Sequence, residues 1–223
     1  MTVQAPDGRR TRWEAHRRTR REELVDAAVR AIRNRGPGVG MDEVAAEAGT
    51  SKAAVYRYFT DRGELYLAVC TRVSERLVSQ LTAALADEQE PRRQLSVAID
   101  AYLRIIEADP DVYRFVVQRP QAERPVSADP VRDLDALVGA HVAKLIGQRL
   151  EGTGVDSSAA GPWGHGLVGL VRSAADHWLD QRPPMSREAL RDHLSDLAWS
   201  GLAGILAATG REVDSTPPTW RSS

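Results

Sequence analysis

The stretch from Met41 to Phe59, MDEVAAEAGTSKAAVYRYF, constrains the fold of this chain more than any other. Its first half has one apolar side and predicts a short helix over residues 41–48. Gly49 follows at a place where a helix end favours a left-handed residue. Thr50 and Ser51 then offer N-caps for a second helix over residues 52–59. Two short helices joined by a turn that contains glycine form a helix-turn-helix.

The second predicted helix has the composition of a recognition helix, which enters the DNA major groove through its N-terminal residues. Ala53 and Ala54 are small enough to let the backbone approach base edges. Lys52 adds a positive charge where the free N–H groups of the helix end already favour phosphate.

Tyrosines on this helix can donate hydrogen bonds to phosphates at the rim of the groove. Tyr56 shares a face with Lys52, whereas Val55 and Phe59 share the other face and are expected to pack inward. Tyr56 and Tyr58 could instead be ordinary core residues, but beside a helix-turn-helix the phosphate role is the favoured interpretation.

Charge is distributed unevenly along the chain. Residues 1–62 contain 13 Lys and Arg and 9 Asp and Glu, a net charge of +4, whereas the whole chain has a net charge of −1. The first predicted helix, residues 12–35, opens with several arginines, namely Arg12, Arg17, Arg18, Arg20 and Arg21. Such a run is often only a solvated face, but before a helix-turn-helix it is expected to follow phosphates or enter a minor groove.

Residues 23–67 resemble the DNA-binding domain of the TetR family of transcriptional regulators. The pairs that carry the resemblance are Val44-Ala45, Ala48-Gly49, Ser51-Lys52, Val55-Tyr56 and Tyr58-Phe59. Arg62 falls where the family usually has a lysine that contacts phosphate. Gly40 is a departure, because the family commonly has Thr or Ser there. Glycine still tolerates the cap position, but a side-chain phosphate contact is lost.

Residue chemistry and the resemblance together predict a set of DNA contacts. This set consists of Arg17, Arg21, Thr50, Ser51, Lys52, Ala53, Ala54, Tyr56, Arg57, Tyr58 and Arg62.

The remainder of the chain is predicted to be helical, because apolar residues recur at helical spacing along it. No strand is expected, because strict alternation of apolar and polar residues is absent. The expected fold is all-α, with a three-helix helix-turn-helix head followed by a six-helix body for ligand binding and dimerisation. The six expected body helices cover residues 61–88, 91–108, 111–118, 130–150, 163–181 and 186 onwards. The expected domains are a flexible basic arm (1–11), a DNA-binding domain (12–60), a body (61–210) and a disordered tail (211–223).

The last two predicted helices are apolar on more than one face and rich in small residues. This pattern predicts a homodimer through a two-fold four-helix interface, which is also what the last two long helices form in the TetR family. The resemblance further implies a small-molecule effector held by the body. Candidate contacts are polar or aromatic residues on apolar faces, namely Tyr102, Tyr113, Phe115, His141, Arg172, Asp176 and Trp178. Core packing is equally open for each, and Arg172 and Asp176 could pair at i, i+4.

Motifs for catalysis and metal binding are missing from the sequence. The five histidines have no metal-ligand spacing, no phosphate loop or Gly-x-Ser-x-Gly is present, and Cys70 is the single cysteine. No catalytic residue, metal or cofactor is therefore expected. No apolar run approaches the roughly 20 residues that cross a bilayer, and no signal peptide is recognised, so a cytoplasmic protein without a membrane partner is expected.

These features predict a ligand-responsive transcriptional regulator that binds a palindromic double-stranded DNA operator as a dimer. A largely hydrophobic effector would release it. Most members of the TetR family repress, which favours a repressor. The alternative is a helical ligand-binding protein without specific DNA readout.

Overall fold

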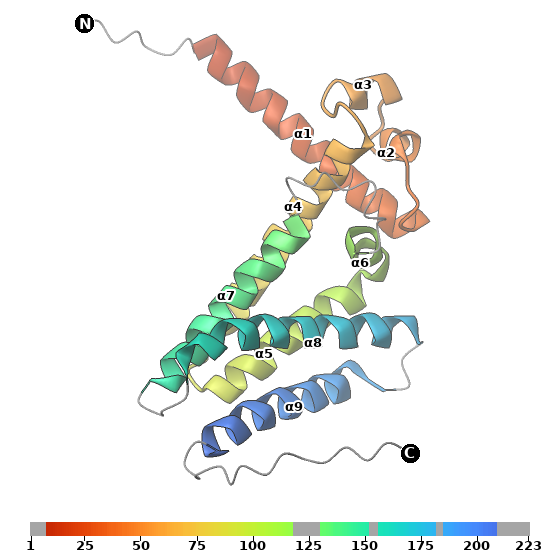
Figure 1. Cartoon of the computed structure of the whole chain (residues 1–223). Helices are drawn as coiled ribbons and strands as arrows, with labels where there is room; N and C mark the ends of the chain where they lie inside the picture. The colour runs from red at the N-terminus through yellow and green to blue at the C-terminus, as the bar shows by residue number, and fades with distance from the viewer. Residues whose placement is uncertain (1–7, 118–129, 152–155, 182–184, 209–223) are drawn as a thin grey trace, which may run out of the picture. The chain divides into compact units, whose positions relative to one another are not determined.

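The computed structural model describes residues 8–117, 130–151, 156–181 and 185–208, and the side chains of all of these except residues 8–12, 130–134, 149 and 205–208. The described residues form nine α-helices, one short 3-10 helix and no strand (Figure 1). The helices are α1 (Gly8–Arg35), α2 (Met41–Glu47), α3 (Lys52–Tyr56), α4 (Arg62–Leu85), α5 (Pro91–Ala108), α6 (Pro110–Val117), α7 (Pro130–Leu150), α8 (Ala160–Asp180) and α9 (Arg187–Ala208), with the 3-10 helix η2 at Ser157–Ala159. The predicted all-α fold is confirmed.

Helix boundaries differ from the predicted ones by a few residues. α1 begins at Gly8, so residues 8–11 of the predicted flexible arm are helical. Arginine is a good helix former and no proline interrupts this segment, so nothing in it stops the helix. α3 ends at Tyr56 and α4 at Leu85, each three residues earlier than predicted. Residues 1–7 and the predicted tail, 211–223, lie outside the described residues.

The chain divides into two compact units. The first comprises residues 1–83 and 104–134, and the second comprises residues 84–103 and 135–223. The first unit therefore includes most of α4 and all of α6 in addition to the three head helices. The predicted division into domains at residue 60 stays a prediction.

The core of the first unit is built from apolar residues at helical spacing. Leu24 and Ile32 of α1 pack with Val44 of α2, Val55 of α3 and Phe59, and all five are almost completely buried. Leucine, isoleucine and valine side chains buried in this way each stabilise a fold by roughly 1.5–3 kcal/mol. α2 and α3 are too short to be stable alone, so this core is what holds the recognition helix.

Specific polar contacts attach α6 to the same unit. The Tyr66 hydroxyl of α4 donates to the carbonyl oxygen of Val116 at 2.9 Å, and the Tyr66 ring lies 5.5 Å from that of Phe115. Arg33, near the end of α1, donates twice to Asp109 at 2.6 and 2.7 Å. The residue that joins α5 to α6 is therefore tied to α1.

The second unit is held by close helix packing and by ion pairs. α7 and α8 cross so tightly that a Cβ added at Gly164 would lie 2.5 Å from the backbone nitrogen of Ala143. Arg187 of α9 pairs with Asp100 of α5, and both side chains are largely buried. Arg92 and Asp196 form a second α5–α9 pair at 2.7 Å.

Candidate nucleic-acid interface

The turn between α2 and α3 has the geometry that its sequence predicts. Gly49 has a φ of +61°, the left-handed conformation that glycine adopts most easily. The backbone N–H of Thr50 donates to the carbonyl of Ala45 at 2.9 Å, which closes the end of α2. The Ser51 hydroxyl accepts from the N–H of Ala54 at 3.2 Å and caps α3, as predicted.

One face of α3 is exposed and the opposite face is buried. Val55 and Phe59 have no exposed surface, which confirms that they pack inward. Tyr56 is 45% exposed, and Lys52 and Arg57 are exposed as well. Ser51 and Ala53 are also exposed, so polar, cationic and small side chains share the open side of the helix.

The other predicted contact residues of this segment are less open. Thr50, Ala54 and Tyr58 are half-buried, and Tyr58 packs against the core of the first unit. A half-buried tyrosine can pack with its ring and still present its hydroxyl. Both interpretations of Tyr58 therefore remain compatible with its position.

Lys52 has an acidic neighbour that the sequence pattern did not reveal. Its ammonium lies 2.8 Å from the Asp42 carboxylate of α2. The hydrogen bond and the charge of Asp42 raise the pKa of Lys52 above its ordinary value. The cation at the start of α3 is therefore paired within the head, through an exposed contact that water and salt screen.

Arg21 is fixed by two partners inside the first unit. Its guanidinium lies 4.7 Å from the centre of the Phe59 ring and 3.1 Å from the Glu64 carboxylate. The same carboxylate accepts the backbone N–H of Thr60 at 2.8 Å. That backbone hydrogen bond, followed by the contact with Arg21, holds the pKa of Glu64 below its ordinary value. Arg21 thus joins α1 to the start of α4, and its predicted DNA contact stays a prediction.

Arg17 lies one turn before Arg21 and has a different environment. Its guanidinium lies over the ring of Trp13, 5.7 Å from the ring centre, and both side chains belong to α1. Trp13 is 62% exposed, and every residue from 13 to 19 is exposed. This segment is helical without lying against the core.

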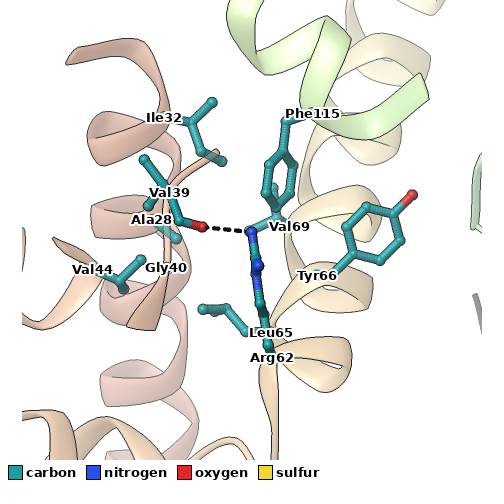
Figure 2. Close-up of a pocket in the computed structure, with 10 residues that line it drawn as sticks. All are labelled: Ala28, Ile32, Val39, Gly40, Val44, Arg62, Leu65, Tyr66, Val69 and Phe115. Atoms are coloured by element: carbon teal, nitrogen blue, oxygen red, sulfur yellow. Dashed lines mark hydrogen bonds between the residues drawn. The ribbon is translucent and has the colours of Figure 1, made fainter. Parts of the chain in front are cut away.

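Arg62 reaches back to the loop before α2. Its Nη2 donates to the carbonyl oxygen of Val39 at 3.1 Å and approaches that of Gly38 at 3.5 Å. Figure 2 shows the guanidinium extended from α4 toward this loop, beside a small hollow. Both contacts use one nitrogen of a group with five donors. Phosphate contact by Arg62 remains a prediction.

Gly40 is the N-cap residue of α2, and its own N–H donates to the Glu43 carboxylate at 3.0 Å. A Cβ at this position would lie 3.1 Å from the same carboxylate. The Glu43 carboxylate therefore occupies the space that a Thr or Ser side chain would need at position 40.

The hollow in Figure 2 is mostly apolar and belongs wholly to the first unit. It leaves room for about one water molecule. Its lining residues are Ala28, Ile32, Val39, Gly40, Val44, Arg62, Leu65, Tyr66, Val69 and Phe115. It is too small to hold an effector.

Candidate effector residues occur in both units. Tyr113 and Phe115 belong to the first, whereas Tyr102, His141, Arg172, Asp176 and Trp178 belong to the second. Phe115 packs against Tyr66. Trp178 is buried and donates its indole N–H to the carbonyl oxygen of Met185 at 3.1 Å.

Arg172 donates to Asp135 of α7 at 2.7 Å, a partner 37 residues away. His141 is exposed, and Tyr102, Tyr113 and Asp176 are half-buried. All seven effector contacts stay predictions.

Several ion-pair partners of the predicted site residues were missed from the sequence because they meet only after folding. Asp42, Glu64 and Asp135 pair with Lys52, Arg21 and Arg172 across separate helices. No local spacing marks such pairs. Within the described parts of the chain, no group of three or more His, Cys, Asp or Glu side chains is placed to hold a metal ion. The helices searched in those parts include none long and apolar enough to cross a membrane.

Comparison with known proteins agrees with this geometry. Residues 24–69 match the family described as bacterial regulatory proteins, tetR family, and residues 80–215 match the tetracyclin repressor-like C-terminal domain. An uncharacterised HTH-type transcriptional regulator of Mycobacterium tuberculosis is 36% identical over 92% of this chain and 86% of its own length.

Two further proteins extend the comparison. The HTH-type transcriptional activator FasR of Mycolicibacterium smegmatis is 31% identical over 83% of this chain and 84% of its own. The crystal structure of FadR from Bacillus subtilis in complex with stearoyl-CoA has a TM-score of 0.64 at 14% identity, covering 81% of this chain and 98% of that one, which is a likeness of fold.

A helix-turn-helix with an exposed recognition face, two matched family regions and relatives that span most of the chain lead to one conclusion. The chain belongs to the TetR family of transcriptional regulators, with a DNA-binding helix-turn-helix at its N-terminal end.

Proposed function

We propose that this protein is a ligand-responsive regulator that binds a roughly two-fold symmetric DNA operator as a homodimer. The carrying observation is the open face of α3, where Lys52, Ala53 and Tyr56 lie exposed on a helix whose other face is buried. Recognition helices use their N-terminal residues on base edges and their flanking residues on phosphates. The exposed residues of α3 have the sizes and charges for both tasks.

Dimerisation is proposed through α8 and α9. Leu197 is 59% exposed in the single chain, and Gly201 and Gly204 are exposed at the following helical positions. An apolar residue followed by small residues along one stripe allows two helices to approach closely, which suits a self-complementary two-fold interface. Two recognition helices would then enter successive major grooves about 34 Å apart.

The effector is proposed to be a largely hydrophobic small molecule. FadR from Bacillus subtilis shares the fold and was crystallised with stearoyl-CoA, which makes that molecule a suitable first probe. A ligand shifts the regulator only as far as its affinity differs between the DNA-binding and the released state. Stearoyl-CoA is therefore expected to weaken operator binding in a concentration-dependent manner, measured by fluorescence anisotropy, with free coenzyme A as the control.

Repression is proposed as the outcome of operator binding, since most family members repress. Activation is the second candidate, favoured by the activator FasR, which is similar over most of the chain. A reporter gene placed downstream of the selected operator separates the two. Expression that falls when the regulator is supplied supports repression, and expression that rises supports activation.

The DNA-binding proposal is tested by selecting duplexes from a random pool and then varying the charges on α3. Lys52→Ala is expected to weaken all sequences alike and to lower the salt slope by roughly 1, the effect of one lost phosphate contact. Asp42→Asn is the matched opposite change, because it removes the acidic partner 2.8 Å from Lys52 and should strengthen binding. Failure to enrich any sequence would favour a ligand-binding protein without specific DNA readout.

A further inference from the structure

An exposed carboxylate lies beside the open face of α3, where DNA binding would favour cations. Asp42 is the second residue of α2, and its Oδ2 lies 2.8 Å from the Nζ of Lys52, the first residue of α3. The Asp42 side chain is 68% exposed. A negative charge at this place repels the phosphates of an approaching duplex. Its presence therefore requires a reason other than attraction to the DNA backbone.

The start of α2 has another acidic residue to stabilise it. Glu43 also lies in the first turn, where an acid favours the helix, and its carboxylate accepts the N–H of Gly40 at 3.0 Å. Among the described residues, the hydrogen bond of the Asp42 carboxylate is the one from Lys52 to Oδ2. The other oxygen, Oδ1, is available to a donor from outside the protein.

We propose that Asp42 reads a cytosine in the major groove and is a specificity-determining residue of the DNA-binding site. This inference rests on the proposed DNA-binding function and adds a base contact from α2 to the contacts of α3. Cytosine presents its N4 amino group as a donor in the major groove, and a carboxylate is the acceptor that pairs with it. One C·G base pair in each half-site would be recognised in this way.

Lys52 fixes where the carboxylate lies and offsets its charge. A lysine ammonium has three donors, so Lys52 can hold Asp42 and still donate to a phosphate. A recognition helix enters the groove through its N-terminal residues. A carboxylate held 2.8 Å from the first side chain of α3 is therefore carried to the base edges together with that helix.

The groove edges of the other bases suit a carboxylate less well. Thymine presents the acceptor O4, and guanine presents the acceptors N7 and O6. Adenine has an amino group, but the acceptor N7 lies next to it. A carboxylate that faces any of these bases meets an acceptor for which it has no proton. Loss of the Asp42 contact should therefore reduce the discrimination in favour of cytosine about fivefold.

The test selects duplexes from one random pool in parallel with wild type, Asp42→Asn and Asp42→Ala. Wild type is expected to enrich cytosine at one position of each half-site. Asp42→Asn should shift that position alone toward adenine, because an amide pairs with both N6 and N7 of adenine. Asp42→Ala should enrich no base there. Both variants should retain the circular dichroism spectrum of wild type, because the side chain is exposed and Glu43 keeps its bond to Gly40.

Affinities for matched duplexes give a second readout. Loss of the acidic charge strengthens binding to every duplex, whereas loss of the cytosine contact acts on the selected duplex alone. The preference of wild type for the selected duplex over one with thymine at that position should fall about fivefold in Asp42→Ala. Asp26→Asn is the matched control, because Asp26 is an exposed carboxylate of the same unit that pairs with Arg72 of α4. This control should retain both the wild-type base frequencies and the wild-type preference.

The outcomes separate this inference from the function on which it rests. If wild type and Asp42→Asn enrich the same bases at every position, the inference alone is overturned, and Asp42 serves only as the partner of Lys52. Changes spread over all positions also overturn it, because Asp42 would then act by orienting α3. Failure of wild type to enrich any duplex overturns the proposed function itself.

Discussion

The recognition motif of the first unit and the helix packing of the second unit are stabilised in different ways. In the motif, the hydrogen bonds that shape the turn and cap α3 join residues three to five apart, such as Ser51 with Ala54 and Thr50 with Ala45. In the second unit they join residues far apart, such as Arg187 with Asp100, 87 residues earlier. The motif can therefore be recognised from the sequence residue by residue. For the second unit, the sequence predicts the helices but not which residues pair between them.

The largest expected effect tests how far the head depends on its core. Phe59 is completely buried and also supports the Arg21 guanidinium. Phe59→Ala should destabilise the first unit by about 3–5 kcal/mol and abolish DNA binding, while helices of the second unit persist. Circular dichroism melting together with DNA titration measures both effects.

Tyr56→Ala is the matched control on the exposed face of α3. It should weaken DNA binding without lowering the melting temperature. If Phe59→Ala melted like wild type, the core would not be what holds the recognition helix.

A smaller effect tests the packing of the second unit. Gly164→Ala adds a Cβ that would meet the backbone of Ala143 and Gly139 at 2.5 and 2.6 Å, so we expect a loss of about 1–3 kcal/mol. Gly166→Ala adds the same atom to the same helix where nothing lies within 4 Å. Replacing this glycine should stabilise the helix by roughly 0.5–1 kcal/mol.

Thermal unfolding at one fixed protein concentration measures the pair, because a dimer's melting temperature depends on concentration. Equal changes in melting temperature for Gly164→Ala and Gly166→Ala would contradict the tight crossing of α7 and α8.

The smallest effect concerns pH and the junction of α1 with α4. The pKa of Glu64 is held below its ordinary value of 4.5, chiefly by the N–H of Thr60. The folded state therefore favours the charged form of Glu64. The stabilisation from this carboxylate is fully present above pH 4.5 and is lost as the pH falls through the lower, folded-state pKa. Glu64→Gln should cost about 0.5 kcal/mol at pH 7, since the pair with Arg21 is screened by solvent.

Melting curves of wild type and Glu64→Gln across a pH series provide the measurement. The difference in melting temperature between wild type and the variant should become smaller below pH 4.5. A difference that stays constant into strong acid would show that the carboxylate charge plays no part in joining α1 to α4.

Much of the fold could be predicted because apolar periodicity and breakers are local signals. The orientation of α3, with Val55 and Phe59 inward and Tyr56 outward, followed from spacing alone. The carboxylate partners of Arg21 and Lys52 could not be predicted in this way. A cation that binds phosphate and a cation that pairs with a carboxylate cannot be distinguished in the sequence. The predicted start of α1 lies too late because residues 1–11 are polar and include Pro6 and Gly8, a composition that favours a mobile arm, whereas the helix begins at Gly8.

The N-cap of α3 has a consequence for how this surface can evolve. Ser51 uses a lone pair to accept the N–H of Ala54, and a hydroxyl retains its own proton to donate. The hydroxyl of Ser51 thus accepts the hydrogen bond that caps α3 and can still donate one to DNA. Alanine would remove both roles together, and aspartate would keep the cap while bringing a negative charge toward DNA. Threonine keeps both roles with its hydroxyl, and asparagine keeps them with its carbonyl oxygen as acceptor and its amide group as donor. Selection for stability and selection for DNA binding therefore favour the same few residue types at this position.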